Sequence, residues 1–319
     1  MELNKLVIGD KVTDGVYCLY SMHKKNDKYD CVLKDRTGTL ACELAAERYE
    51  ASMADLVGGA VKVTFIIING QNTTSLGVIK ALTAAEKGTF KPSELFDGLS
   101  TEKITEYTGI IKYHISKIPD PSIRSFVSQI LTDDTLLKLS QIPASLGYHA
   151  RYCGGALATT ACVTKLVSQV GLQYVRGENG LYQVNLDWSL LLAASLLQCV
   201  GLPEYITSEA PFRKTDIGIE RGYMSVLQHK IEMAHFENKL ISDDVLARIL
   251  NILASSVPMK SGVKATHSEG KILRKCLHLY EELDIQDAEI AGHVVDGDEN
   301  YFFDSKLKGY ISLQEREVA

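Results

Sequence analysis

The chain has 319 residues, of which 45% are hydrophobic and 23% are charged. This composition is typical of a globular protein, and the length predicts about two domains. The longest apolar stretch, residues 190–200, is too short for a membrane span, and the charged N-terminus lacks the apolar core of a signal peptide. The seven cysteines form no CxxC pair, which argues against a disulfide framework or a zinc ribbon. We therefore expect a cytoplasmic protein with no membrane partner.

Charge is distributed unevenly along the chain. Residues 1–91 contain 12 Lys and Arg against 11 Asp and Glu, a net charge of +1. The remainder contains 22 against 29, a net charge of −7. A polyanionic partner would therefore meet the first part of the chain more readily than the second.

The first 90 residues contain short runs rich in β-forming residues. We predict strands at residues 16–20, 29–33, 39–44, 60–69 and 73–82, with turns at 23–28, 35–38 and 70–72. Residues 45–57 are expected to form a short helix or an irregular segment. Five closely spaced strands with one such excursion predict a small closed β-barrel over residues 1–90.

After a linker at residues 87–92, the hydrophobic pattern becomes helical. Helices are predicted at residues 92–96, from 100 onwards, and at 121–131, 133–141, 155–170, 188–200, 216–238, 243–255 and 268–283. Residues 172–187 are expected to form a loop or a small hairpin. We interpret residues 91–142 as a helical linker region and 143–319 as an all-α domain with a C-terminal tail. The predicted fold class is α+β multidomain.

Two sets of residues resemble a known two-domain family. The string LKDRTGTL at residues 33–40 resembles the strand–turn–strand of an OB-fold nucleic-acid-binding domain. HARYCGG at 149–155 and LLLAASLLQCVG at 190–201 resemble the framework of an HD domain. Their order is similar to that of the YhaM-type bacterial 3′–5′ exoribonucleases, over roughly residues 10–290. The resemblance implies an OB-fold barrel followed by an HD-like helical domain.

The resemblance also implies where metal ligands would lie, and most of them are replaced. The family's histidines, His-Asp pair and last acidic element fall on His149, Thr159, Gln198, Cys199, Tyr223, Ser255, Ser256 and Glu281. Metal-dependent phosphodiesterases need imidazoles and carboxylates to hold divalent cations that generate hydroxide. An amide and a soft thiol are poor substitutes for the His-Asp pair. The resemblance therefore implies a degenerate HD domain, a pseudoenzyme with no expected cofactor.

An active enzyme with a rearranged site is the alternative. It would use His149, His278, Glu281 and Asp284 with Mn or Mg, and His278 and Glu281 are spaced i, i+3 so that both could hold one metal. Cys199, at the end of an apolar helical pattern, is interpreted as a small buried hydrophobic residue rather than a catalytic thiol.

The barrel supplies candidate groups for binding single-stranded nucleic acid. Such domains stack bases on aromatic rings within a basic groove. The candidate residues are Tyr17, Tyr20, Tyr29, Phe65, Lys24, Lys25, Lys28, Lys34 and Arg36. Strand alternation places Tyr29 on the same face as Cys31 and Leu33, so if that face is the core, Tyr29 packs instead of stacking on a base.

Three function classes follow. The first is a protein that binds single-stranded RNA or DNA, with RNA favoured, in which the helical domain is a scaffold, an oligomerisation surface or a ligand sensor. The second is the rearranged 3′–5′ exoribonuclease or phosphodiesterase. The third is a protein–protein interaction module, which the acidic helical region would also suit. Proteins of the resembled family form oligomers, which implies a homo-oligomer here.

Overall fold

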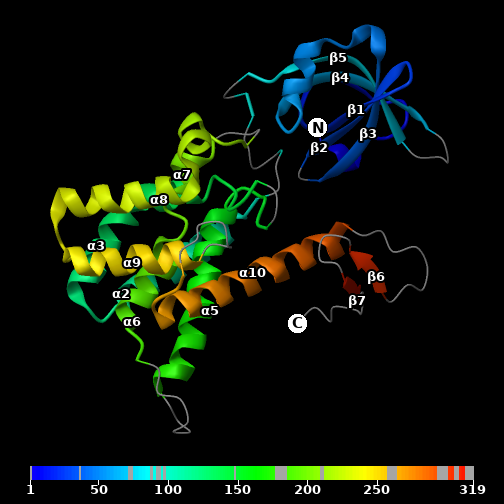
Figure 1. Ribbon diagram of the computed structural model, residues 1–319. Coiled ribbons are helices and arrows are strands. Elements are labelled where there is room, and N and C mark those ends of the chain that lie inside the picture. Colours follow the sequence, from blue (N-terminus) through cyan, green and yellow to red (C-terminus); the bar gives the residue numbers. More distant parts are fainter. Residues whose placement is uncertain are drawn as a thin grey trace.

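The N-terminal part of the chain forms a closed five-stranded barrel in the computed structural model (Figure 1). The structure describes residues 2–35, 37–70, 75–86, 89–90, 95, 98–146, 149–176, 185–208, 212–256, 264–292, 301–304 and 309–312. Around the barrel the strand order is β1-β2-β3-β5-β4, and only β3 and β5 run parallel. The strands are β1 (Lys11–Lys25), β2 (Lys28–Asp35), β3 (Gly38–Ala45), β4 (Ala60–Asn69) and β5 (Ser75–Ala84). The predicted barrel is confirmed.

The connections of the barrel differ from the prediction in two places. The turn expected at residues 23–28 shrinks to Asn26 and Asp27, because β1 continues to Lys25, which pairs with Lys28. Asn26 has a φ of 54°, a left-handed conformation that Asn adopts more readily than most residues. The excursion at residues 45–57 contains two 3-10 helices, η2 (Ala46–Arg48) and η3 (Ala51–Leu56).

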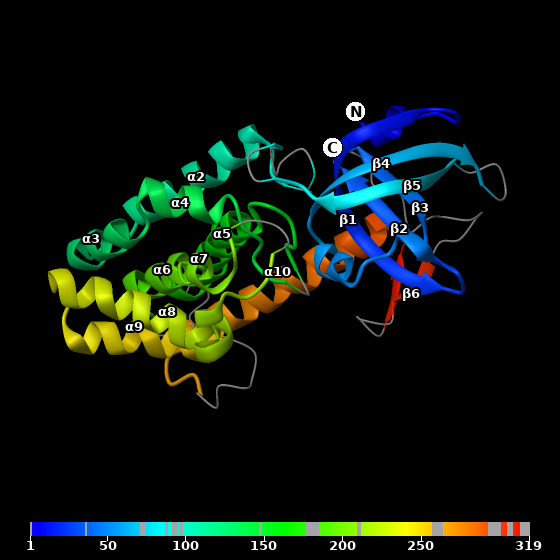
Figure 2. The ribbon, with the colours of Figure 1, turned by 90° about the horizontal axis from the view of Figure 1, so that it is seen from above.

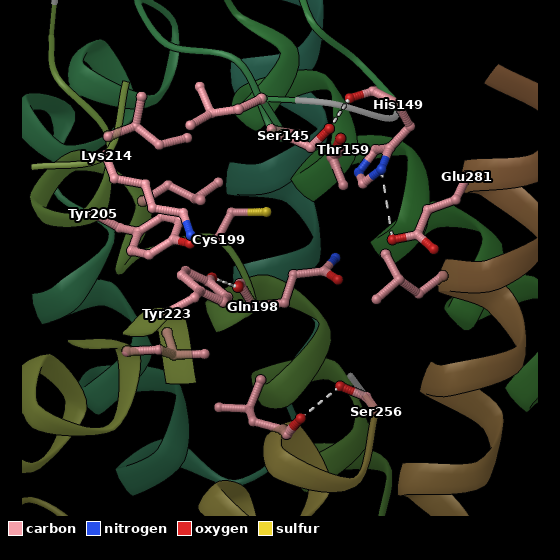
Figure 3. Close-up of a pocket in the computed structure, with 17 residues that line it drawn as sticks. Ser145, His149, Thr159, Gln198, Cys199, Tyr205, Lys214, Tyr223, Ser256 and Glu281 are labelled. Carbon is pink, nitrogen blue, oxygen red and sulfur yellow. Dashed lines mark hydrogen bonds and ion pairs between the residues drawn. The ribbon is translucent and has the colours of Figure 1, made fainter. Parts of the chain in front are cut away.

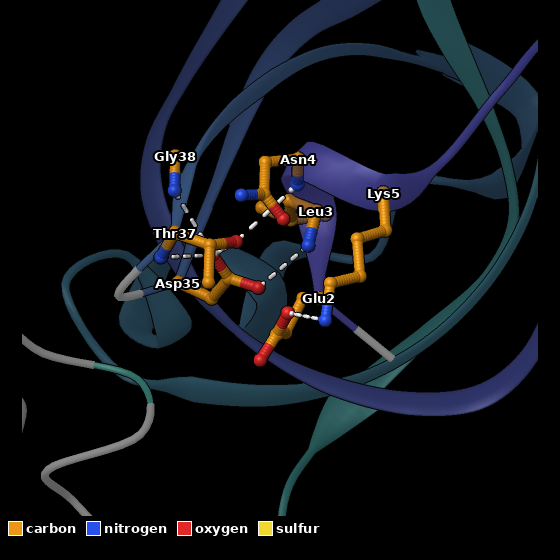
Figure 4. Close-up of polar contacts among 7 residues, drawn as sticks. All are labelled: Glu2, Leu3, Asn4, Lys5, Asp35, Thr37 and Gly38. Carbon is orange, nitrogen blue, oxygen red and sulfur yellow. Dashed lines mark hydrogen bonds and ion pairs between the residues drawn. The ribbon is translucent and has the colours of Figure 1, made fainter.

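A buried carboxylate, that of Asp35, fastens the N-terminal segment to the β2–β3 turn (Figure 4). It accepts the backbone N–H of Leu3 at 2.8 Å, and the N–H groups of Thr37 and Gly38 at 2.7 and 3.1 Å. The Thr37 hydroxyl donates a fourth bond at 2.6 Å. Leu3 begins the 3-10 helix η1 (Leu3–Lys5). The aspartate of the LKDRTGTL string therefore has a structural role, because a buried charge of this kind needs several donors.

The described residues between 98 and 292 are mainly helical. They contain nine α-helices: α2 (Thr101–Ser116), α3 (Pro121–Ile130), α4 (Asp133–Leu139), α5 (Gly155–Arg176), α6 (Trp188–Leu197), α7 (Leu202–Tyr205), α8 (Asp216–Asn238), α9 (Asp243–Ser256) and α10 (Ser268–Gly292). Side chains of Ser100, Asp120, Thr132, Asp187 and Thr215 cap helix N-termini. The all-α prediction for this region is confirmed.

Helix α6 is the centre of the helical region. Every residue from Ser189 to Leu197 is buried, and α2, α3, α5, α9 and α10 all pack against this helix. A helix that is apolar all round is expected in such a position. One hydrophobic core runs from Ile111 on α2 to Cys276 on α10. Helices α2 to α4 therefore share one hydrophobic core with the later helices, and the division into a helical linker region at 91–142 and a domain at 143–319 stays a prediction.

Several predicted segments fall partly or wholly outside the described residues. Of the linker at 87–92 only residues 89 and 90 are described, and of the helix at 92–96 only Leu95. The predicted loop at 172–187 is wrong for residues 172–176, which continue α5, and residues 177–184 lie outside the description. After α10, β6 (Tyr301–Asp304) and β7 (Gly309–Ser312) pair as an antiparallel hairpin. No helix among the described residues is long and apolar enough to cross a bilayer.

The barrel lies beside one end of the helical bundle, with α10 extending toward it (Figure 2). The two parts meet at a shared cavity, to which β1 and β2 contribute from the barrel, and Pro143, Ser145, Leu146, Arg151 and Phe212 from the helical region. Residues far apart in sequence are thereby brought to one junction.

Candidate functional site

A cavity of about 390 Å³ opens at the C-terminal end of α6 (Figure 3). Seven of the eight positions that the family resemblance singled out line it together: His149, Thr159, Gln198, Cys199, Tyr223, Ser256 and Glu281. These residues come from the loop before α5, from α5 itself, and from the ends or faces of α6, α8, α9 and α10. Ser255 does not line the cavity; its hydroxyl donates to the carbonyl of Ile252 at 3.1 Å.

The turn after α6 sets the floor of the cavity. Gln198 follows the last helical residue, and its carbonyl accepts the hydroxyl of Tyr223 on α8. Gly201 lets α8 approach this turn closely, because a Cβ there would lie 2.8 Å from the Cα of Leu227. Gly222, with a φ of 73°, interrupts the helical path of α8 directly before Tyr223. Gly201 thus lets α8 lie close to the turn after α6, and Gly222 precedes the tyrosine that bonds to Gln198.

An imidazole on the loop before α5 faces a carboxylate on α10. His149 Nδ1 lies 3.6 Å from Glu281 Oε1. Burial lowers the pKa of His149, with Asp284 acting in the opposite direction, and burial raises the pKa of Glu281. Both shifts favour the uncharged form of each group. Asp284 accepts the backbone N–H of Ala150 at 2.6 Å, so α10 holds this loop at two consecutive residues.

Burial also favours the uncharged form of the Cys199 thiol and of the Tyr223 phenol. Burial raises the pKa of Cys199 to about 12, so its thiol is protonated at neutral pH and is a poor nucleophile. Burial likewise raises the pKa of Tyr223. The Nε2 atom of Gln198 is buried and has no hydrogen-bond partner among the described residues. The amide of Gln198 points into the cavity in Figure 3.

These donors do not fit the divalent cations that the family resemblance implies. The lining offers one imidazole and one carboxylate, together with an amide, a protonated thiol and hydroxyls. Across the described ranges, no group of three His, Cys, Asp or Glu side chains is placed to hold a metal. The alternative site needs His278 and Glu281 as two ligands of one metal. Instead, exposed His278 lies 3.3 Å from Glu282 and does not line the cavity.

No sequence pattern indicates the residues that form the cavity mouth and its apolar wall. Lys214, in the segment before α8, lies with its ammonium 5.7 Å from the ring centre of Tyr205. A single β-bridge between Ile206 and Lys214 places both near the cavity. The apolar wall is formed by Leu146, Leu202, Ile206, Leu227, Leu253 and Leu277. Lys214 belongs to a short non-periodic segment, so no pattern in the sequence could have marked it.

In the barrel, two of the predicted stacking rings are in the core. Tyr17 and Phe65 are each 1% exposed and meet edge to face, with ring centres 5.8 Å apart. Their prediction as base-stacking residues is wrong, because inward-facing strand positions fill the interior of a small barrel. Tyr29 stacks on Tyr49 at 4.1 Å and packs against the same core. Tyr20 is 59% exposed.

The predicted cations of the barrel differ in what they contact. Lys28 forms an ion pair with Glu43, and Lys25 lies 3.2 Å from Asp30. Lys24 is exposed near the end of β1. Lys34 lies over the ring of Tyr20, 5.6 Å from its centre. Arg36 lies outside the described residues.

Tyr20 and Lys34 line the second cavity, of about 320 Å³, at the junction of the barrel and the helical region. Arg151 and Phe212 line it from the helical side. Ser145 and Leu146 line both this cavity and the one at the end of α6, so the two cavities are neighbours. One exposed aromatic ring and two cationic side chains therefore share a concave site.

No protein-family model, no curated protein and no solved structure matches this chain.

Proposed function

We propose that this protein binds single-stranded nucleic acid, with RNA favoured, at the junction between an OB-fold barrel and a degenerate HD-like helical domain. The strand order β1-β2-β3-β5-β4, with β3 and β5 parallel, supports the OB-fold assignment. The convergence of seven replaced ligand positions on one cavity supports the HD-like assignment. We propose further that the strand is held without being cleaved, since the donors of that cavity suit a metal poorly.

The observation that carries the proposal is the position of Tyr20. It is 59% exposed, Lys34 lies over its ring, and both face a cavity that Arg151 also lines. Single-strand binding combines an aromatic ring on which a base stacks with cations that follow the phosphates. An aromatic ring and two cations in one concave junction meet both requirements.

The ion pairs of the other cations also support this location. Lys25 and Lys28 face Asp30 and Glu43 on the outer surface of β1, β2 and β3, so their charge is compensated locally. The junction places Lys34 and Arg151 in one cavity with the Tyr20 ring, and the modest net charge of residues 1–91 is consistent with a short footprint.

Fluorescence anisotropy with labelled oligo(U) and oligo(dT) at low salt tests the proposal. Tyr20→Ala is expected to weaken binding by about 1–3 kcal/mol, the range for loss of one stacked base. Lys34→Gln should weaken binding and reduce its salt dependence. The matched control is Lys62→Gln on β4, where the lysine lies 3.2 Å from Asp14 and outside the junction cavity.

Three results would overturn the proposal: no binding of either oligomer at low salt, equal binding by Tyr20→Ala and the wild type, or release of nucleotides when manganese is added. The last result would favour the phosphodiesterase alternative. Partners that remain in a pull-down after nuclease treatment, with no oligomer binding, would favour the protein–protein module.

A further inference from the structure

The cavity at the end of α6 has the features of a small-molecule site, independent of the nucleic-acid site proposed above. Its volume of about 390 Å³ lies within the range of ligand pockets. Leucine and isoleucine side chains from five segments form its wall. Such pockets combine apolar walls with a few polar groups that fix the orientation of the ligand.

Two donors of this cavity are available to a ligand. The Nε2 atom of Gln198 is buried and without a partner among the described residues, and Gln198 is 7% exposed. Buried donors are rarely left unsatisfied in folded proteins, so this amide indicates an acceptor that a ligand would supply. The second donor is the ammonium of Lys214, the one lysine or arginine among the described lining residues.

Three hydroxyls of the lining are already engaged, whereas the buried Thr159 hydroxyl has no hydrogen-bond partner among the described residues. Ser145 donates to the carbonyl of His149 at 2.9 Å, and Ser256 donates to the carbonyl of Leu253 at 2.7 Å. The Tyr223 hydroxyl donates to the carbonyl of Gln198. The Gln198 amide N–H and the Lys214 ammonium donate, and the Thr159 hydroxyl can donate as well, so a ligand with acceptor groups suits the cavity.

The lining contains one ammonium group and one carboxyl group, and this pair suits a ligand with a single negative charge. Lys214 and Glu281 lie on opposite sides of the cavity in Figure 3. A phosphate monoester carries nearly two negative charges and would meet a single ammonium, with a carboxyl group opposite. A carboxylate carries one charge and suits one ammonium.

We propose that this cavity binds a small amphipathic carboxylic acid that carries an oxo group. Its carboxylate lies at Lys214, its apolar body lies against the leucine wall, and its oxo oxygen accepts from Gln198. The uncharged state of His149 agrees with this orientation, because it leaves no buried imidazolium deeper in the cavity to attract the carboxylate.

Isothermal titration calorimetry on the full chain tests the charged end, with octanoate and its neutral isostere octanamide as probes. We expect octanoate to bind more tightly than octanamide. Lys214→Gln should weaken octanoate binding at least about threefold, as expected for a partly exposed ion pair, and leave octanamide binding unchanged. The matched control is Lys112→Gln on α2, where the lysine lies 2.7 Å from Asp133 and outside the cavity.

The oxo group is tested with 4-oxooctanoate and 7-oxooctanoate. We expect one of these acids to bind about five- to a hundredfold more tightly than octanoate, because it satisfies the buried amide. Gln198→Leu should abolish this preference and retain octanoate binding. Because Lys214 is exposed, its variant should fold even if Gln198→Leu does not.

The proposal is overturned if octanoate does not bind in the millimolar range. It is also overturned if Lys214→Gln and the wild type bind octanoate equally, or if neither oxo acid binds more tightly than octanoate. None of these results depends on oligonucleotide binding at Tyr20, so this proposal and the nucleic-acid proposal fail separately.

Discussion

The imidazole Nδ1 of His149 lies 3.6 Å from the carboxylate Oε1 of Glu281, on one side of the cavity that collects the replaced ligand positions (Figure 3). In a metal site of the implied kind, each of these groups would direct a lone pair toward a cation. Here they face each other directly, and burial favours the uncharged form of both. The pair is thus a neutral contact between α10 and the loop before α5.

Glu281→Gln should stabilise the protein at pH 7. Burial raises the pKa of Glu281 above 4.5, so the folded state binds a proton that the unfolded state has released. Stability is therefore lost as the pH rises through 4.5 and the folded-state pKa, and an amide avoids this loss. We expect a gain of about 1 kcal/mol in the free energy of unfolding by urea at pH 7. The gain should vanish below pH 4.5, and a constant difference at all pH values would contradict the explanation.

His149→Gln should reduce the sensitivity of the protein to mild acid. Burial lowers the pKa of His149 below 6.5, so as the pH falls below 6.5 the unfolded state gains a proton before the folded state does. The wild type then loses stability on going from neutral to mildly acidic pH. The variant should lose less over the same interval, measured by urea unfolding. An identical pH dependence in the two proteins would show that His149 does not contribute.

Cys199 should resist alkylation in the folded protein. Its pKa of about 12 leaves fewer than about one thiol in a thousand ionised at pH 8. We expect iodoacetamide to modify Cys199 only after denaturation, as followed by peptide mass spectrometry. Cys162, which is partly exposed, serves as the internal comparison. Rapid native modification of Cys199 would instead indicate an activated thiol and reopen the catalytic interpretation.

Asp35→Ala should destabilise the barrel by about 3 kcal/mol or more. The substitution leaves the N–H groups of Leu3, Thr37 and Gly38 without their acceptor, and each buried unsatisfied donor costs about 1–3 kcal/mol. Asp30→Ala is the matched control, since Asp30 forms a surface ion pair with Lys25 whose loss should cost about 1 kcal/mol or less. Equal effects of the two substitutions in urea unfolding would argue against the structural role of Asp35.

The element types were predictable because hydrophobic period and turn residues are local signals. Helix α8 begins and ends at the predicted residues 216 and 238, and β4 covers the predicted 60–69. The extent of β1 was not predictable, because its charged end at Lys24 and Lys25 looks like a loop in sequence and is held only by pairing with β2. The membership of α2 to α4 in the core likewise depends on tertiary packing.

The candidate sites were predictable to different degrees. The resemblance identified positions that the fold brings together around Gln198 and Cys199, although it could not indicate Lys214 at the mouth. Composition alone could not separate Tyr17 in the core from Tyr20 on the surface. A β-bulge between Leu19 and Ser21 changes the register with β2 there, and such irregularities leave no clear trace in the pattern of a strand.

Gly201→Ala should damage the cavity at the end of α6 more than it damages the barrel. The added Cβ would lie 2.8 Å from the Cα and 3.0 Å from the backbone nitrogen of Leu227, so α8 has to move away from the turn that carries Gln198. Overpacking of this kind costs about 1–3 kcal/mol. We expect a lower free energy of unfolding, weaker octanoate binding and unchanged oligonucleotide binding at Tyr20. Gly109→Ala on α2, where an added Cβ meets nothing within 4 Å, is the matched control and should be neutral or slightly stabilising.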